Sequence, residues 1–309
     1  MADPAWSSRH TSGGLAGAKP YFEIPHGESE SIYRGQQTSG LLLLHSVLER
    51  DIYICNPFTR QYIKLCCPRK CKSDNYLMSY GFGVSEISGK YKVVCTNVDA
   101  GSGSFHVYTL GTGTWRRVEA ASVSGYTFCY NAHIVCNGNL HWTVYDSTHT
   151  LWICGFDLET ERVSIFSAPA VDRRVANVKL NVLRDCLCLS YTQGYKLVIW
   201  MMKEYRVGES WTIECKISVD FDIDFGYDFD CHDTTVHPIK LFKNGDVLML
   251  FEDKCLVYYS HETRTTQQVG MLTDGNPEDA DEDDISFAMI YTPSVFSLRK
   301  FGFENVTSF

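Results

Sequence analysis

The sequence has no excess of positive charge and no long apolar run. Its 309 residues contain 28 Lys and Arg against 37 Asp and Glu, a formal charge of -9 at pH 7. Nucleic acids and anionic membranes bind clustered Lys and Arg, so this balance argues against both as partners. No apolar run approaches the ~18 residues of a membrane-spanning helix, and the opening MADPAWSSRH lacks the apolar core of a signal peptide. We therefore expect a protein of the cytoplasm, the nucleus or both.

Recognisable catalytic and cofactor motifs are also scarce. There is no G-x-S-x-G nucleophile elbow, and Gly81-x-Gly83 lacks the third glycine and the following helix of a nucleotide site. Thirteen cysteines are present, mostly inside apolar runs, which indicates reduced, buried thiols. Cys67 and Cys71 have the spacing of zinc ligands, but no clean second pair follows. We expect no catalytic residue, cofactor or metal, and a protein that is not an enzyme.

What the chain does contain is a repeat of two alternating hairpins. One hairpin joins two strands through a turn with Asn, Asp, Gly or Thr, and it occurs five times, at 52–65, 105–118, 151–165, 197–217 and 255–269. A tighter hairpin precedes four of these, with turns at 88–90, 137–139, 184–185 and 244–246. Asn-Gly between apolar runs, as at Asn137-Gly138, is a strong hairpin signal because a type I′ turn needs two residues that tolerate positive φ.

The period of this repeat predicts an all-β, β-propeller-like fold. A pair of hairpins, which makes about four strands, recurs every 45–58 residues. This is the spacing of propeller blades. About five blades are expected. The first has only three recognisable strands, 41–45, 52–55 and 61–65, and a strand within 287–298 is available to close it. A β-sandwich or two small barrels remain the alternative.

The expected domain boundaries follow from composition. Residues 1–37, rich in Gly, Ser and His, have no apolar period and are expected to be a loosely ordered tail. Residues 38–300 form the predicted interaction domain, with an acidic loop at 272–286, and residues 301–309 form a C-terminal tail.

The segment 220–230 is the candidate protein-interaction site. It alternates aspartates with apolar side chains, which is the pattern of an ordinary half-buried strand and also of a loop that offers aromatic anchors to a basic partner. Both interpretations stay open. The candidate interaction residues are Phe221, Asp222, Asp224, Phe225, Tyr227 and Phe229.

Short motifs also occur in a characteristic order between about residues 39 and 299. They include Ile54-Cys-Asn-Pro-Phe-Thr-Arg60, Tyr80-Gly-Phe-Gly-Val84, Asn137-Gly-Asn-Leu-His-Trp142, Pro238-Ile-Lys-Leu-Phe242 and Tyr291-Thr-Pro-Ser294. In order and spacing they resemble the F-box-associated domain of plant F-box proteins. The resemblance implies a β-propeller-like module that captures a target protein for ubiquitination by an SCF-type, cullin-based ligase.

In that family a helical F-box N-terminal to this domain binds a Skp-type adaptor. Its Leu-Pro start and helix-period Leu and Ile are not recognisable in residues 1–38. A Skp-type adaptor and a cullin are therefore expected partners only if an F-box lies upstream, and the target protein is unknown. Two other functions stay open: a stand-alone propeller adaptor, and a propeller enzyme such as a glycosidase, whose paired carboxylates would come from different blades.

Overall fold

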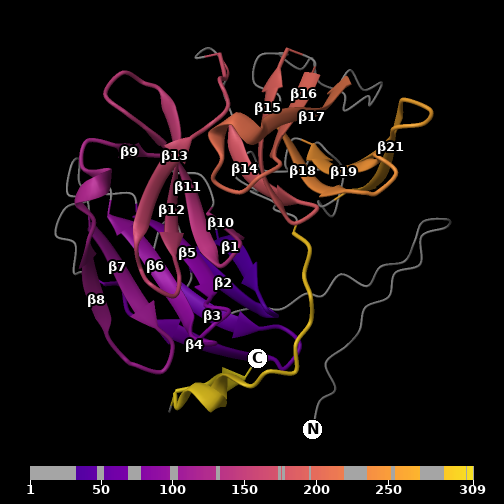
Figure 1. Ribbon diagram of the computed structural model, residues 1–309. Helices are drawn as coiled ribbons and strands as arrows, with labels where there is room; N and C mark the ends of the chain where they lie inside the picture. The colour runs from indigo at the N-terminus through magenta and orange to yellow at the C-terminus, as the bar shows by residue number, and fades with distance from the viewer. Residues whose placement is uncertain are drawn as a thin grey trace, which may run out of the picture.

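The computed structural model describes residues 33–46, 52–68, 78–97, 104–129, 133–172, 175, 178–194, 196–218, 235–251, 255–271, 289–303 and 305–308. Nearly all regular structure in these ranges is antiparallel β-sheet, arranged as five small sheets that form a five-bladed β-propeller (Figure 1). The predicted fold class is thereby confirmed. The separate, radially arranged sheets exclude the sandwich alternative, because a sandwich packs two sheets face to face.

Each blade is built on a four-stranded meander in which consecutive strands pair. Blade 1 contains β1 (Tyr33–Thr38), β2 (Leu41–Ser46), β3 (Ile52–Asn56), β4 (Gln61–Leu65) and the short β22 (Thr307–Ser308). Blade 2 contains β5 (Met78–Val84), β6 (Tyr91–Asn97), β7 (Ser104–Thr109) and β8 (Trp115–Glu119). Blade 3 contains β9 (Thr127–Phe128), β10 (Ile134–Cys136), β11 (Asn139–Tyr145), β12 (Leu151–Asp157) and β13 (Val163–Ser167). The short strands β9 and β22 add to β11 and β4 outside the meander order.

The last two blades have four strands each. Blade 4 contains β14 (Lys179–Leu183), β15 (Cys186–Gln193), β16 (Lys196–Met202) and β17 (Trp211–Ser218). Blade 5 contains β18 (Val236–Leu241), β19 (Val247–Phe251), β20 (Cys255–Ser260) and β21 (Thr265–Met271). The first strands of successive blades lie against one another, β1 on β5, β5 on β10, β10 on β14 and β14 on β18, which is the radial order of a propeller.

The tight hairpins form because their turn residues adopt left-handed conformations. Asn137 and Gly138 have φ of 49° and 68°, and Arg184 and Asp185 have φ of 51° and 60°. Positive φ at both central residues is the signature of a type I′ turn, whose twist matches that of the strands it joins. Asn and Gly tolerate this region readily, whereas Arg184 is held there by the pairing of β14 with β15.

Apolar side chains between neighbouring blades form the core. Ile54 and Phe82 share a buried cluster across blades 1 and 2, and Phe105 and Trp142 share one across blades 2 and 3. Further clusters join blades 3 and 4 and blades 4 and 5. Neighbouring residues of an inner strand enter the clusters on its two sides, as the two-residue period of a strand requires. In β12, Cys154 lies in the cluster shared with blade 2 and Ile153 in the cluster shared with blade 4.

The structure corrects two expectations about blade 1. The blade is not incomplete, because β1 supplies its first strand, and β1 begins at Tyr33, inside the range 1–37 that was expected to be a tail. A turn at Ser39 and Gly40, both with positive φ, joins β1 to β2, and the two strands pair over six residues. Gly35, Gln36 and Gln37 hid this strand from sequence analysis, because they lack the apolar alternation of a strand.

The predicted closing strand at 287–298 is also wrong for the described residues 289–297, which form no strand. They belong to a segment, residues 289–303, that we call the C-terminal strap. Figure 1 shows it in yellow, running beside blade 1 and ending below β4. Strand pairing at the C-terminus comes instead from β22, which adds to the outer edge of β4. A short β22 covers an edge that would otherwise expose unpaired backbone groups.

Candidate interaction face

Both hairpin turns of every blade lie at the same end of its strands, and we call this end of the propeller the hairpin face. The turns between β3 and β4 and between β12 and β13 are built alike. The side chain of Asn56 accepts hydrogen bonds from the backbone N–H of Phe58 and Thr59. That of Asp157 accepts from Glu159 and Thr160 in the same way. An Asx residue at the end of a strand therefore fixes each turn.

Tryptophans repeat in a similar way at the start of the outer strands. The Trp115 indole N–H donates to the Cys66 carbonyl at 2.7 Å, which joins blade 2 to blade 1. The Trp211 indole N–H donates to the Ser167 carbonyl at 3.0 Å, which joins blade 4 to blade 3. Each bond satisfies a polar group that sits within a mostly apolar contact. The repeat in the sequence thus encodes contacts between blades as well as strands within them.

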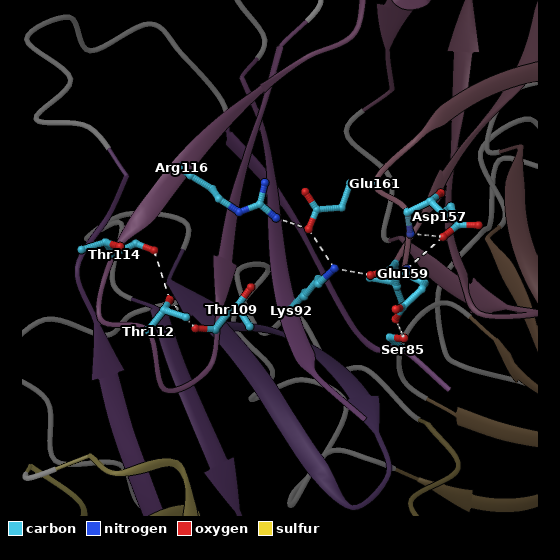
Figure 2. A network of polar contacts seen from close by, with 11 residues as sticks. Ser85, Lys92, Thr109, Thr112, Thr114, Arg116, Asp157, Glu159 and Glu161 are labelled. Carbon is cyan, nitrogen blue, oxygen red and sulfur yellow. Dashed lines mark hydrogen bonds and ion pairs between the residues drawn. The ribbon is translucent and has the colours of Figure 1, made fainter. Parts of the chain in front are cut away.

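A network of charged groups joins blades 2 and 3 at the hairpin face. Figure 2 shows Lys92 of β6 and Arg116 of β8 converging on Glu161, which lies in the turn between β12 and β13. Lys92 Nζ is 2.8 Å from Glu161 Oε1 and also donates to the Leu158 carbonyl. The Lys92 side chain is only 6% exposed, so its charge depends on these acceptors.

Both carboxylates of this network are held in the charged form. Burial tends to raise the pKa of Glu161, but hydrogen bonds and charge from Arg116 and Lys92 outweigh burial and leave the pKa below its usual range. Glu159 hydrogen-bonds to the Ser85 hydroxyl, and this bond lowers the pKa of Glu159. Because the charges are matched within the protein, the network fits a role in fixing the blades rather than in binding a partner.

Polar contacts also join blades 3 and 4. His141 Nε2 lies 2.8 Å from the Tyr205 hydroxyl, and the Arg206 guanidinium donates to Asn139 Oδ1 at 2.8 Å. Burial, aided by the charge of Arg206, lowers the pKa of His141 from 6.5 to about 3. The ring is therefore neutral at physiological pH.

The C-terminal strap lies across the hairpin face at blades 1 and 2. Asn56 Nδ2 donates to the carbonyls of Ser294 and Phe296 at 2.9 and 2.7 Å. Gln61 Oε1 accepts from the Ser297 hydroxyl and from the Leu298 N–H. Leu298 is fully buried in the cluster shared by blades 1 and 2. The strap is therefore held both by hydrogen bonds from the Asn56 and Gln61 side chains and by an apolar anchor.

The six residues predicted for partner binding, Phe221, Asp222, Asp224, Phe225, Tyr227 and Phe229, lie outside the described residues. The described strands on either side are β17, which ends at Ser218, and β18, which begins at Val236.

The sequence did not single out Lys92, Glu161 or the role of Asn56 in holding the strap. An Asn before a Pro at the end of a strand signals a turn, but nothing local signals a bond to a residue 238 positions away.

The buried thiols and the Ser–His contact of the described region show no catalytic arrangement. Burial raises the pKa of Cys55 and Cys188 to about 12, so both are neutral thiols. No group of three or more His, Cys, Asp or Glu suited to a metal occurs within the described ranges. Ser79 Oγ is 3.4 Å from both ring nitrogens of His133. An oxygen at the same distance from both nitrogens lies on the lone-pair axis of neither one. Neither nitrogen therefore aims a lone pair at the hydroxyl.

No helix within the ranges that the structure describes has the length and apolarity to cross a membrane.

Comparisons with known proteins agree with this architecture. The F-box protein At3g07870 of Arabidopsis thaliana is 28% identical over 263 residues, covering 72% of this chain and 61% of the relative. The F-box protein CPR1 of the same plant is 31% identical over 194 residues, covering 52% of this chain and 46% of the relative. The chain thus spans about half to three fifths of these relatives.

Among solved structures, a lectin from Aleuria aurantia covers 77% of each chain with 11% identity and a TM-score of 0.42, a likeness too distant to support any conclusion. The decisive match is to the family model described as the F-box associated beta propeller domain, over residues 19–298. This chain therefore belongs to the F-box associated β-propeller family.

Proposed function

We propose that this chain is the substrate-recognition part of an SCF-type, cullin-based ubiquitin ligase, acting in the cytoplasm or nucleus. The observation that carries the proposal is the family match over residues 19–298, together with relatives that are F-box proteins. The fold supports it, because a propeller provides a rigid scaffold whose loops vary without disturbing the core. The charge matching of Lys92 with Glu161 and the neutral thiols fit a binding scaffold better than an enzyme.

Within this function we propose the acidic–aromatic segment 220–230 as a target-binding element. Aromatic anchors dominate the energetics of protein interfaces, and surrounding aspartates speed the encounter with a basic target. Replacing Phe225 and Tyr227 together by Ala should weaken target capture by about 1–4 kcal/mol. The matched control replaces Val269, an exposed apolar residue of β21, by Ala. Equal target affinity of the double variant and the control would remove this segment from the interface.

Affinity purification of the native protein from its own tissue, followed by mass spectrometry, tests the ligase assignment. Where an F-box lies upstream of this chain in the native protein, we expect a Skp-type adaptor and a cullin to co-purify with it, and the target to accumulate when the proteasome is inhibited. Recovery of target proteins without adaptor or cullin would instead establish a stand-alone adaptor.

A further inference from the structure

Docking of the C-terminal strap brings two segments that carry exposed apolar side chains, Phe58 and Val295, to the same buried amide group. Asn56 Oδ1 accepts from the Phe58 N–H at 3.0 Å, while Asn56 Nδ2 binds the carbonyls on both sides of Val295. Phe58 and Val295 therefore flank the same buried amide group. Phe58 is 60% exposed and Val295 80% exposed, although large apolar side chains are usually covered.

The conformation of this pair is fixed rather than accidental. Asn56 is fully buried and caps the turn that carries Phe58. On the strap, Phe296 packs against Tyr91 and Phe301, with ring centroids 5.9 and 5.1 Å away. Gly40 lies so close to Ser294 that a Cβ there would clash with it. Because both backbones are held, the two side chains are presented with little conformational entropy left to lose on binding.

The described residues of the two segments that carry the pair are basic in balance. The described residues of blade 1, 33–46 and 52–68, and the strap contain no Asp or Glu, in a chain with 37 of them. Arg60, Arg299 and Lys300 are all exposed. Gln61, next to Arg60, binds Ser297 and Leu298, which places Arg60 near the two basic residues that follow them. Along the chain, the acids nearest to the strap are Asp284 and Glu304.

The contrast with the rest of the hairpin face is informative. Arg116 and Lys92 are matched by Glu161, whereas neither Arg60 nor Arg299 forms an ion pair within the residues that the structure describes. Exposed apolar residues on segments that also carry exposed charges of one sign match the anatomy of an interface, with an apolar centre and a polar rim that selects a complementary partner.

We propose that Phe58 and Val295, with Arg60, Arg299 and Lys300 around them, form a docking surface for an acidic protein segment that carries bulky apolar side chains. We call it the Phe58–Val295 surface. A free phosphate or nucleic acid would use the basic residues but leave the apolar pair unexplained. A two-fold contact with a second copy would bring like charges together, because such a contact uses the same patch on both subunits. A segment with both acidic and apolar side chains would pair with the basic residues and pack on the apolar pair.

The test is a selection of random twelve-residue peptides, displayed on phage, against the purified full chain. We expect the enriched peptides to combine Asp or Glu with Phe, Leu or Trp. Affinities are then measured by fluorescence polarisation on the wild type and on two variants. Phe58→Ser with Val295→Ser removes the apolar pair, and Arg60→Glu with Arg299→Glu reverses the charge without touching a buried group. Val269→Ser, a change of an exposed apolar residue on blade 5, is the control.

Each variant pair should weaken the selected peptides by roughly tenfold or more, and Val269→Ser should leave them unchanged. The loss from the charge reversal should shrink at high salt, because exposed charges are screened. Enriched peptides without the acidic–apolar combination, or equal binding to all variants, would overturn the proposal. If the apolar variant unfolds, the charge reversal decides alone.

This inference goes beyond the proposed ligase function and is measured without any ligase component. Failure of the adaptor and cullin to co-purify with a native protein that carries an F-box would refute the ligase assignment and leave the peptide result standing. Equal binding of selected peptides to all variants would remove the Phe58–Val295 surface and leave the ligase assignment standing.

Discussion

The contact between blades 2 and 3 and the contact between the strap and blade 1 hold the same scaffold by different chemistry. The first uses opposite charges, with Lys92 and Arg116 on Glu161. The second uses the neutral amide of Asn56, backbone carbonyls and the apolar anchor Leu298. Charges that are matched inside the protein stabilise the fold and are not available to a partner. Where docking is neutral, the nearby charges of Arg60 and Arg299 stay available to a partner.

The largest effect in this comparison should come from removing the apolar anchor of the strap. Leu298→Ala deletes a fully buried side chain and leaves a cavity between blades 1 and 2, so we expect a loss of about 2–5 kcal/mol in the free energy of unfolding. Urea unfolding followed by tryptophan fluorescence measures it. Val295→Ala, on the same strap but exposed, should change stability by less than about 0.5 kcal/mol. Equal effects of the two changes would show that the strap is not anchored as described.

Breaking the charged contact should cost somewhat less. Glu161→Ala leaves buried Lys92 with only the Leu158 carbonyl as acceptor, and we expect a loss of about 2–3 kcal/mol, below the range for fully buried pairs because Glu161 keeps some exposure. Adding Lys92→Met should recover much of it, since the uncompensated charge is gone. The control Arg117→Ala breaks an exposed pair with Glu119 and should change thermal unfolding little. No recovery in the double variant would mean that Glu161 acts through packing.

The contact between blades 3 and 4, where His141 meets Tyr205, differs from the strap in its sensitivity to acid. The folded protein holds His141 neutral, with a pKa lowered to about 3, whereas the unfolded chain binds the proton near 6.5. Stability from this group is complete above pH 6.5 and falls as pH drops toward 3, by about 2 kcal/mol between pH 8 and pH 5. In a plot of unfolding free energy against pH, His141→Phe should reduce the fall between pH 8 and pH 5 by about 2 kcal/mol. The fall due to His133, whose pKa is also lowered by burial, should stay. The strap contact uses no group that titrates between pH 8 and pH 5. The loss of unfolding free energy caused by Leu298→Ala should therefore be the same at both pH values.

The smallest expected effect concerns the tryptophans that repeat between blades. Trp211→Phe keeps most of the apolar contact but removes the indole N–H that donates to the Ser167 carbonyl. We expect a loss of about 1 kcal/mol, typical of one hydrogen bond. Trp115→Phe should cost a similar amount, because its indole N–H makes the corresponding bond to the Cys66 carbonyl. Differential scanning calorimetry would resolve both, and a much larger loss at one site would break the equivalence of the repeats.

The sequence by itself determined the repeat, and with it the all-β propeller. Hairpin turns such as Asn137-Gly138 and Arg184-Asp185 are local, because a turn's conformation depends on the residues that form it. The order of the blades follows from the same pattern, since consecutive strands pair. β1 escaped prediction because its glycine and glutamines carry no apolar period, and its place in the sheet comes from its six paired residues with β2.

Only the tertiary structure decided how the ends of the chain meet and which surfaces are left open. The bond from Asn56 to Phe296 joins residues 240 positions apart, and it holds the strap beside the turn that carries Phe58. Such contacts have no sequence signature, because either residue would form the same local turn or extended segment without the other. The sequence determines each blade through short-range conformation, whereas closure of the chain onto blade 1 is decided by which distant groups can satisfy one another's hydrogen bonds and bury apolar area together.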